Sequence, residues 1–220
     1  MELTVATFNI HHGEGTDGRL DLERTAAAIT ATGAGLIALQ ELDRGFDRSG
    51  GVDQPAQLAE LTGLDIHFFP TVRRGEGEYG IALASSDALI VEVRSLPRLG
   101  VEEPRGAVHA SWRGVHVVGV HLATQRAARR LQAPAVVELA APSSGPVLVL
   151  GDFNATHREL RRLRNDGLVA GPGRAPTVQA RVGGRRIDHV LAGGGARALR
   201  TWTVPTDASD HVPLVARIEV

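Results

Sequence analysis

The chain has 220 residues, 43% of them hydrophobic and 22% charged, which is the composition of a globular protein able to bury a sizeable core. A formal net charge of −1 excludes a general positive field for holding duplex nucleic acid, and the absence of cysteine excludes disulfides, thiolate nucleophiles and sulfur-ligated zinc. No apolar run approaches the roughly 20 residues that span a bilayer. We therefore expect a cytoplasmic, monomeric protein that does not attach to a membrane and forms one domain over residues 1–220.

The first half of the chain alternates apolar runs with helical patterns. Residues 3–8 are typical of a strand, and Asp21 is placed to cap a helix that ends before Gly33. Residues 36–39 predict the next strand, and a second helix is expected over residues 53–63. Further strand-like segments follow near residues 65–69, 80–84, 89–95 and 106–112.

The second half continues this alternation. Residues 115–120 predict a strand, and residues 125–140 predict a helix that Pro134 must kink or split. Residues 147–150 are four branched apolar residues in a row, which indicates a strand buried on both faces. Late strands are expected near residues 187–191, 200–204 and 212–219.

The order strand, helix, strand occurs twice, and each strand of both copies ends at a polar residue. These residues are Asn9 and Glu41 in the first copy, and His121 and Asp152 in the second, at nearly equal spacing. Such units favour parallel neighbours, whose carboxyl ends meet at one edge of a sheet. We therefore expect the four side chains to converge, and two similar halves to pack sheet on sheet with helices outside.

Two acid–histidine pairs precede the late strands. Side chains alternate along an extended chain, so only one member of Asp188–His189 and of Asp210–His211 need face a shared cleft. The same alternation argues against a hydrolase triad of Ser209 with its two neighbours, because consecutive residues on a strand cannot hydrogen-bond in series. The chain also lacks the G-x-S-x-G motif of serine hydrolases.

Eight short motifs follow one another along the chain: TFNI (7–10), LQE (39–41), YGIALAS (79–85), EPRG (103–106), VHL (120–122), GDFN (151–154), IDH (187–189) and SDHVPL (209–214). Together and in this order they resemble the motifs of the metal-dependent endonuclease/exonuclease/phosphatase superfamily. The ordered set spans nearly the whole chain. The resemblance implies an α/β fold of four layers, an α/β/β/α sandwich in which two mixed sheets pack face to face with helices outside. It also implies hydrolysis of phosphoric esters with a divalent cation.

The chemistry of phosphoester hydrolysis explains these residue types. The negative phosphate repels a nucleophile, so a catalyst must neutralise that charge, orient a water and stabilise the leaving oxygen. Glu41 is the expected metal ligand, with Asn9 beside it and Asp210 as a second ligand, and oxygen ligands favour Mg²⁺ or Mn²⁺. By resemblance, Asp152 would orient or deprotonate the attacking water, and Asn154 would hydrogen-bond to the phosphoryl oxygens.

Other positions are expected to contact the phosphate. His211 and His121 are the candidate phosphate-binding imidazoles, and Asp188 would accept a hydrogen bond from His211 and keep that ring protonated. Arg105, in EPRG, matches a position where relatives carry an arginine near the substrate phosphate, although a surface arginine is an equal alternative. Tyr79 is a candidate for facing the cleft.

We therefore expect a divalent-metal-dependent phosphoester hydrolase, and most specifically a phosphodiesterase that acts on a small or flexible phosphoester. The near-neutral charge and an aromatic content of 4% favour this substrate class over nucleic acid. An endonuclease or exonuclease acting on DNA or RNA is the alternative, and a non-catalytic phosphate-binding protein is a third, weaker one. The arginine runs at 126–130 and 161–164 are interpreted as solvated helix faces, and Thr156 with Glu159 as a capping box that opens a helix.

Overall fold

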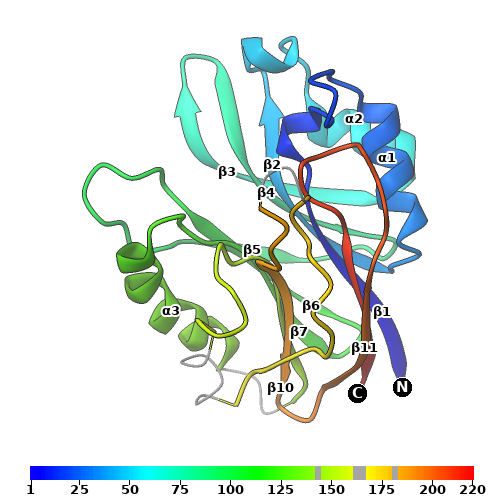
Figure 1. Ribbon diagram of the computed structural model, residues 1–220, viewed down its shortest axis with the longest axis vertical. Coiled ribbons are helices and arrows are strands. Elements are labelled where there is room, and N and C mark those ends of the chain that lie inside the picture. Colours follow the sequence, from blue (N-terminus) through cyan, green and yellow to red (C-terminus); the bar gives the residue numbers. More distant parts are fainter. Residues whose placement is uncertain (142–144, 161–166, 180–182) are drawn as a thin grey trace.

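The structure is a computed structural model that describes residues 1–141, 145–160, 167–179 and 183–220, and it contains two six-stranded sheets packed face to face (Figure 1). In spatial order the first sheet contains β11 (Arg197–Thr203), β12 (Leu214–Glu219), β1 (Glu2–Asn9), β2 (Leu36–Arg44), β4 (Gly77–Ser85) and β3 (Asp65–Arg74). The second sheet contains β5 (Val91–Ser95), β6 (Gly106–Trp112), β7 (Val115–His121), β8 (Val147–Asp152), β10 (Asp188–Gly193) and β9 (Val169–Ala170).

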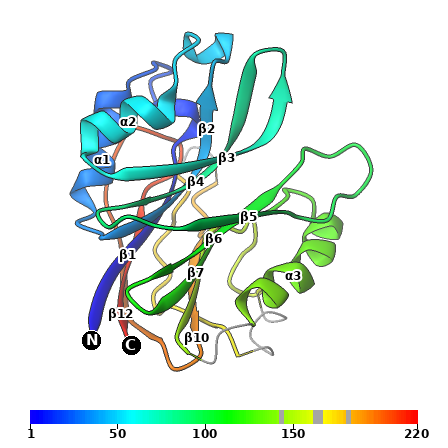
Figure 2. The same cartoon turned by 180° about the vertical axis from the view of Figure 1, so that it is seen from behind.

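Helices cover the outer faces of both sheets. α1 (Leu22–Ala31) and α2 (Gln54–Thr62) pack on the first sheet, and α3 (Arg126–Ala140) packs on the second, as the views from the front and from behind both show (Figures 1 and 2). Two short 3₁₀ helices, η1 (His11–Gly13) and η2 (Asp47–Ser49), follow β1 and β2. The expected four-layer α/β/β/α sandwich is confirmed. No helix among the described residues is long and apolar enough to cross a membrane.

Both predicted parallel pairs are present in the sheets. β1 runs parallel to β2 with Asn9 opposite Gln40, and β7 runs parallel to β8 with His121 opposite Asp152. Alternate apolar side chains from the two sheets fill the space between them, and Leu150 of β8 belongs to this inner core. All six residues of β8 are buried. The fold therefore brings the carboxyl ends of four strands to one edge of the sandwich.

The helix boundaries follow the predicted capping residues. The Asp21 carboxylate accepts a hydrogen bond from the backbone N–H of Arg24 at 2.9 Å, and the Asp53 carboxylate accepts one from Ala56 at 3.0 Å. Gly63 ends α2 in the left-handed conformation that glycine adopts without a steric penalty. These caps confirm that local sequence chemistry sets the start of both helices.

Of the two effects expected of Pro134, a kink or a split, the split does not occur. α3 runs from Arg126 to Ala140 with Pro134 inside it. Proline cannot donate the helical hydrogen bond to the carbonyl of Arg130, which normally breaks a helix. Pro134 is exposed, so water can reach that carbonyl, while the opposite side of α3 packs on the second sheet. Tertiary packing thus retains the helix.

The predicted capping box at Thr156 is present only in part. The backbone N–H and hydroxyl of Thr156 both donate to the Glu159 carboxylate, at 2.9 and 3.0 Å. These contacts hold a turn after β8. Residues 161–166, which include the arginine run at 161–164, lie outside the described residues.

Candidate active site

The four strand-end residues lie together, as the sequence repeat predicted. The Asn9 amide nitrogen donates to Glu41 Oε1 at 2.8 Å and to Asp152 Oδ2 at 3.2 Å. His121 Nε2 lies 3.5 Å from Asp152 Oδ2 and 3.9 Å from Glu41 Oε1. Residues from both sheets therefore meet at one point, with Asp152 at its centre.

Glu41 reaches this point through an unusual backbone conformation. Its φ is 64°, in the left-handed region that residues other than glycine rarely adopt. The register of β2 against β4 shifts between Gln40 and Leu42, so Glu41 is the extra residue of a β-bulge. Such conformations cost on the order of 1–3 kcal/mol and are concentrated at functional sites. The strain at Glu41 is consistent with a carboxylate held in place for its chemistry.

The GDFN segment forms a loop that hydrogen bonds from Asn154 hold in place. Asn154 is left-handed, with φ 48°, and its N–H donates to Asp152 Oδ1 at 2.7 Å. The Asn154 amide nitrogen donates to the carbonyl of Leu122 at 3.0 Å, which ties the loop to the end of β7. A Cβ at Gly151 would lie 1.9 Å from the carbonyl oxygen of Val120. Glycine is therefore needed for the close packing of the two strands just before Asp152.

The Asp152 carboxyl is buried and has an altered acidity. Burial raises its pKa to about 7, and the nearby negative charge of Asp188 acts in the same direction. The positive charge of His211 and the hydrogen bonds from Asn154 and Asn9 oppose this increase. A carboxyl that titrates near neutrality is suited to accept a proton from water.

His211 forms the predicted hydrogen bond with Asp188. The distance from His211 Nδ1 to Asp188 Oδ2 is 2.8 Å, and His211 Nε2 lies 4.0 Å from Asp152 Oδ2. Burial opposes charge on the imidazole. The negative charge and hydrogen bond of Asp188, with the charges of Asp152 and Asp210, outweigh this effect and raise the pKa of His211 to about 10. His211 is therefore an imidazolium at neutral pH, directed toward the same place as Asp152.

His121 differs from His211 in its charge. Burial, followed by the positive charges of Arg105 and His211, holds the pKa of His121 well below its usual value. Arg105 Nη1 lies 2.9 Å from His121 Nδ1 and also 2.9 Å from Glu103 Oε1. The neutral ring therefore accepts a hydrogen bond from the guanidinium.

Arg105 is not a surface arginine, since it is only 9% exposed. Tyr79 is also buried, and burial together with the negative charge of Glu41 raises the pKa of the tyrosine. The Arg48 guanidinium lies 5.3 Å from the centre of the Tyr79 ring. The structure thus brings both predicted substrate-binding residues next to the metal candidate Glu41.

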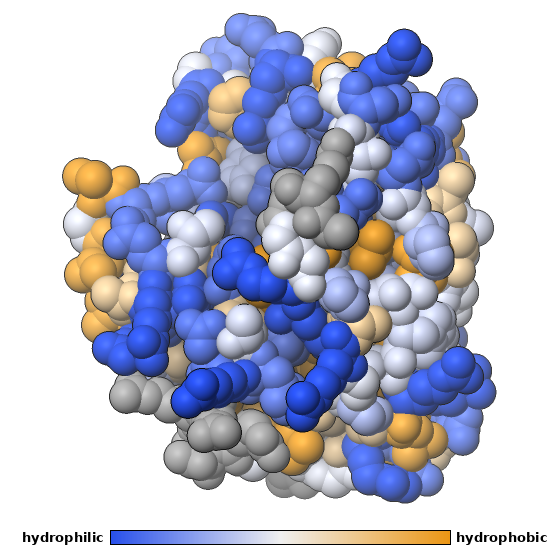
Figure 3. Space-filling model, in the orientation of Figure 1, coloured by the Kyte–Doolittle hydropathy of each residue, from blue (hydrophilic) through white to orange (hydrophobic). Residues whose placement is uncertain are grey.

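Two small cavities lie on either side of Glu103, which lines both of them. One, of about 190 Å³, is lined by Arg105 with Glu102 and Thr124, and the other, of about 130 Å³, is lined by Tyr79 with Arg48. Figure 3 shows a recess in this face of the molecule, between the part built on β3 and β4 and the part around α3, with hydrophilic residues around it. A polar cavity therefore adjoins the arginine that contacts the strand-end cluster through His121.

The residues that could hold a metal form two overlapping groups. Ligand atoms of Asp152, Asp188 and His211 lie within 4.8 Å of one another, and Asp188 Oδ1 is buried with no hydrogen-bond partner among the described residues. In this group the Nδ1 atom of His211 already hydrogen-bonds to Asp188. Glu41 and Asp152, linked by Asn9, are the alternative. Clustered oxygen donors of this kind fit a hard divalent cation.

Two of the predicted metal ligands, Asn9 and Asp210, make hydrogen bonds to neighbouring residues. The oxygen of the Asn9 side chain accepts a hydrogen bond from the backbone N–H of His11 at 3.1 Å, which leaves one lone pair of this oxygen for a cation. No hydrogen bond or ion pair among the described residues joins Asp210 to Glu41 or Asn9, although its charge acts on His211. Both residues therefore lie near the site: Asn9 contacts Glu41, and the charge of Asp210 acts on His211.

Ser209 has a structural role that the sequence did not predict. Its hydroxyl donates to the carbonyl of Asn9 at 2.8 Å and accepts from the N–H of His211 at 3.1 Å. In the sequence, the feature that could have indicated this role is the position of Ser209 directly before the pair Asp210–His211. His189 points away from the site, and its Nε2 lies 2.8 Å from the carbonyl oxygen of Ala155, in agreement with the expected alternation.

Comparisons with known proteins agree with this fold. The model of the endonuclease/exonuclease/phosphatase family matches residues 6–211. An endonuclease/exonuclease/phosphatase from Beutenbergia cavernae is 24% identical with a TM-score of 0.84, over 100% of this chain and 72% of that one. One from Bacteroides vulgatus is 18% identical with a TM-score of 0.79, over 100% and 99%. A mannosyl-6-phosphatase from Bacteroides thetaiotaomicron is 18% identical with a TM-score of 0.71, over 99% and 100%. A comparison with curated proteins found no match.

Proposed function

Because the chain belongs to the endonuclease/exonuclease/phosphatase family and is a phosphoester hydrolase, we propose that it is a divalent-metal-dependent phosphodiesterase of small or flexible phosphoesters. The observation that carries this proposal is the buried Asp152 carboxylate, which lies among Asn9, His121 and His211 at the edge of the sandwich. Residues 1–220 would act as one catalytic domain.

We assign the metal first to Glu41, with Asn9 beside it and Asp210 as a further ligand. Carboxylate and amide oxygens favour Mg²⁺ or Mn²⁺ over softer metals. When bound, the cation would neutralise charge on the phosphate and polarise its oxygens. The strained backbone of Glu41 supports its place as the principal ligand, since strain of this kind is retained where a side chain must be held precisely.

In the proposed reaction Asp152 orients the attacking water and accepts its proton. A pKa of about 7 suits this role, because part of the population is ionised at neutral pH and the conjugate acid remains accessible. Asn154 donates a hydrogen bond to the phosphoryl oxygens through its amide. No side chain in this set acts as a nucleophile, so the water attacks phosphorus directly.

Two further groups would bind the phosphate. His211 donates from its protonated Nε2, and Asp188 keeps the ring charged and oriented. Arg105 offers a guanidinium, which a hydrogen bond to His121 and an ion pair with Glu103 hold in place. These roles suit a negatively charged phosphate, because every group directed at it is a hydrogen-bond donor or a cation.

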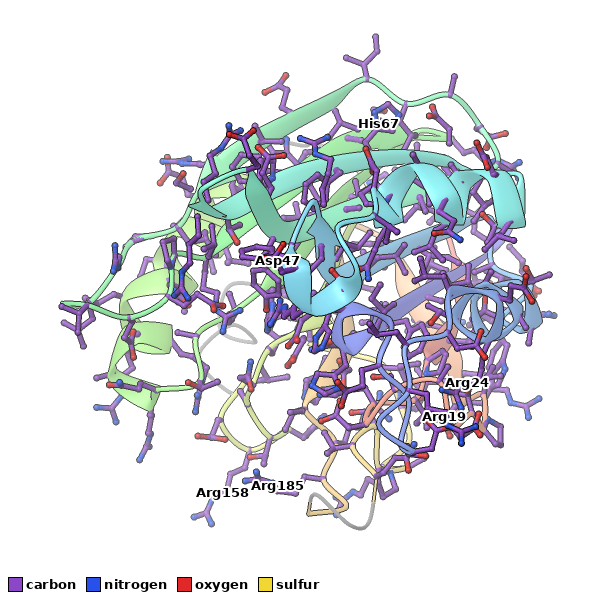
Figure 4. The ribbon with its side chains drawn as sticks, turned by 90° about the horizontal axis from the view of Figure 1, so that it is seen from above. Arg19, Arg24, Asp47, His67, Arg158 and Arg185 are labelled. Atoms are coloured by element: carbon purple, nitrogen blue, oxygen red, sulfur yellow. The ribbon has the colours of Figure 1, made fainter. Side chains whose placement is uncertain are left out.

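A nuclease acting on DNA or RNA is the second candidate. Arg158 and Arg185 are exposed, they come from the loops beside β8 and β10, and they extend from the same side of the molecule (Figure 4). Arginines in such a place favour contacts to a phosphate backbone. A cytoplasmic location and a monomeric state are further proposals, which cell fractionation and light scattering of the purified protein would check.

Steady-state kinetics would separate the two candidates. The purified protein is assayed with Mg²⁺ against small phosphodiesters, phosphomonoesters, and plasmid and single-stranded DNA, at roughly 0.15 M salt, where non-specific nucleic-acid binding is weakened. Higher kcat/KM for small diesters supports the proposal. Far more efficient cleavage of DNA, with a steep dependence on salt, would replace it with the nuclease, and no hydrolysis of any phosphoester would overturn both.

A further inference from the structure

A pocket of about 110 Å³ adjoins the active site on the side of α3. It shares backbone with the site, because Leu122 directly follows His121 and Ala155 directly follows Asn154. Leu122, Ala155 and Leu160 give it an apolar wall. A substrate held at Asn154 therefore has this pocket as its immediate neighbour.

Three arginines from the first turns of α3 line the opposite wall. Arg129 is engaged, since it donates to the carbonyl of Ala123 at 3.1 Å and pairs with Glu159 at 3.1 Å. Arg126 and Arg130 are exposed, and neither has a hydrogen bond or ion pair with any residue that the structure describes. Because Glu159 is already paired with Arg129, the pocket keeps two uncompensated positive charges.

The position of these arginines is unfavourable for the helix itself. α3 has no acidic residue in its first turn, and Gln125 makes no capping hydrogen bond with its side chain. The amino end of a helix carries a partial positive charge, so basic side chains there are destabilising. α1, in contrast, begins with Asp21 as its cap and Glu23 in its first turn. A bound anion would offset the repulsion in α3.

From these observations we propose that the pocket binds a second phosphate group of the substrate. Arg126 and Arg130 would contact that phosphate, and the apolar wall would contact the carbon skeleton that joins it to the scissile phosphodiester. This inference rests on the proposed function, and it narrows the substrate class to phosphodiesters that carry a further phosphate. The second phosphate comes either from a small molecule or from the next residue of a nucleic-acid chain.

The test uses substrates that differ only in the second phosphate. The dinucleoside monophosphate TpT has one phosphodiester, and pTpT and TpTp carry one additional terminal phosphate. Wild-type protein should prefer pTpT or TpTp over TpT by about tenfold in kcat/KM, because arginine–phosphate contacts are charge-assisted. The double variant Arg126→Gln/Arg130→Gln should bring this ratio close to one.

A matched control removes two charges far from the site. Arg197→Gln/Arg217→Gln replaces exposed arginines that pair with Glu219 and Glu2, at the end of the first sheet opposite to Asn9. This variant should keep the preference of the wild type. A single-stranded oligothymidylate distinguishes the two sources of phosphate. If the arginine variant loses far more activity on the oligomer than on pTpT and TpTp, the second phosphate belongs to a nucleic-acid chain.

An equal kcat/KM for all three dinucleotides in the wild type, or the same preference in both double variants, would overturn the second-phosphate pocket alone. If the wild type hydrolyses none of the dinucleotides, the proposed function fails. Calorimetric binding of pTpT and TpTp then tests whether the pocket binds a second phosphate. Weaker binding of these dinucleotides by Arg126→Gln/Arg130→Gln than by Arg197→Gln/Arg217→Gln supports the second-phosphate pocket, and equal binding rejects it.

Discussion

The pairing of His211 with Asp188 makes a quantitative prediction for Asp188→Asn. This change removes the carboxylate charge and keeps the shape of the side chain. In the wild type the pKa of His211 rises from its ordinary 6.5 to about 10, which corresponds to about 5 kcal/mol in favour of the imidazolium. Asp188 makes the largest of the contributions that raise this pKa, so its loss should lower the pKa of His211 by about 1 to 3 pH units.

NMR titration of the imidazole in protein kept free of metal with a chelator would measure this pKa, and His211→Gln would assign the signal. Asp210→Asn is the control and should have a smaller effect, because Asp210 contributes least to raising the pKa. The alkaline limb of kcat/KM should also move to lower pH in Asp188→Asn. An unchanged pKa of His211 would refute the pairing as the source of its charge.

The same pairing predicts how stability depends on pH. A histidine whose pKa is raised in the folded state binds more protons than the unfolded chain does, so its contribution is complete below about 6.5 and is lost as pH rises through about 10. The difference in the free energy of unfolding between wild type and Asp188→Asn should therefore be largest below pH 6.5 and decrease toward pH 10. A constant difference across this range would contradict the assignment.

Three further predictions concern the metal, the GDFN loop and α3. Glu41→Gln should weaken Mn²⁺ binding by at least about tenfold in calorimetry, and an unchanged Kd would exclude Glu41 as a ligand. Gly151→Ala should lower the free energy of unfolding, measured in urea, by at least about 1–3 kcal/mol, because the new Cβ would clash with the carbonyl oxygen of Val120. Gly145→Ala is the control and should change this free energy little, because the space around its new Cβ is open. Pro134→Ala should raise the free energy of unfolding by up to about 3 kcal/mol, because alanine can donate a backbone hydrogen bond to the carbonyl of Arg130. An unchanged free energy of unfolding would show that proline costs α3 no stability.

Local patterns in the sequence predicted much of the fold. Asp21, Asp53 and Gly63 set the helix ends through contacts within a few residues, which is why the sequence alone located them. The twofold strand, helix, strand order predicted that Asn9 and Asp152 would meet, because parallel strands end at the same edge. These features depend on short segments or on general topology.

The features that the sequence did not predict depend on contacts between distant segments. The bulge at Glu41 depends on how β2 pairs with β4, and nothing near Glu41 in the sequence indicates it. The hydrogen bond of Arg105 to His121 requires the loop before β6 to lie beside the end of β7. Pro134 remains helical because the other side of α3 is packed on a sheet. Tertiary contacts override local preference in each case.

The central claim is that a hard divalent cation and Asp152 together hydrolyse a phosphodiester, and kinetics on bis(p-nitrophenyl) phosphate with wild type and Asp152→Asn tests it most directly. We predict turnover by the wild type that a chelator abolishes and Mg²⁺ or Mn²⁺ restores. We also predict that Asp152→Asn stays folded while its kcat falls by about 100-fold to 10,000-fold, as expected for the loss of a general base. Full wild-type activity in excess chelator, or a wild-type kcat in Asp152→Asn, would contradict the account.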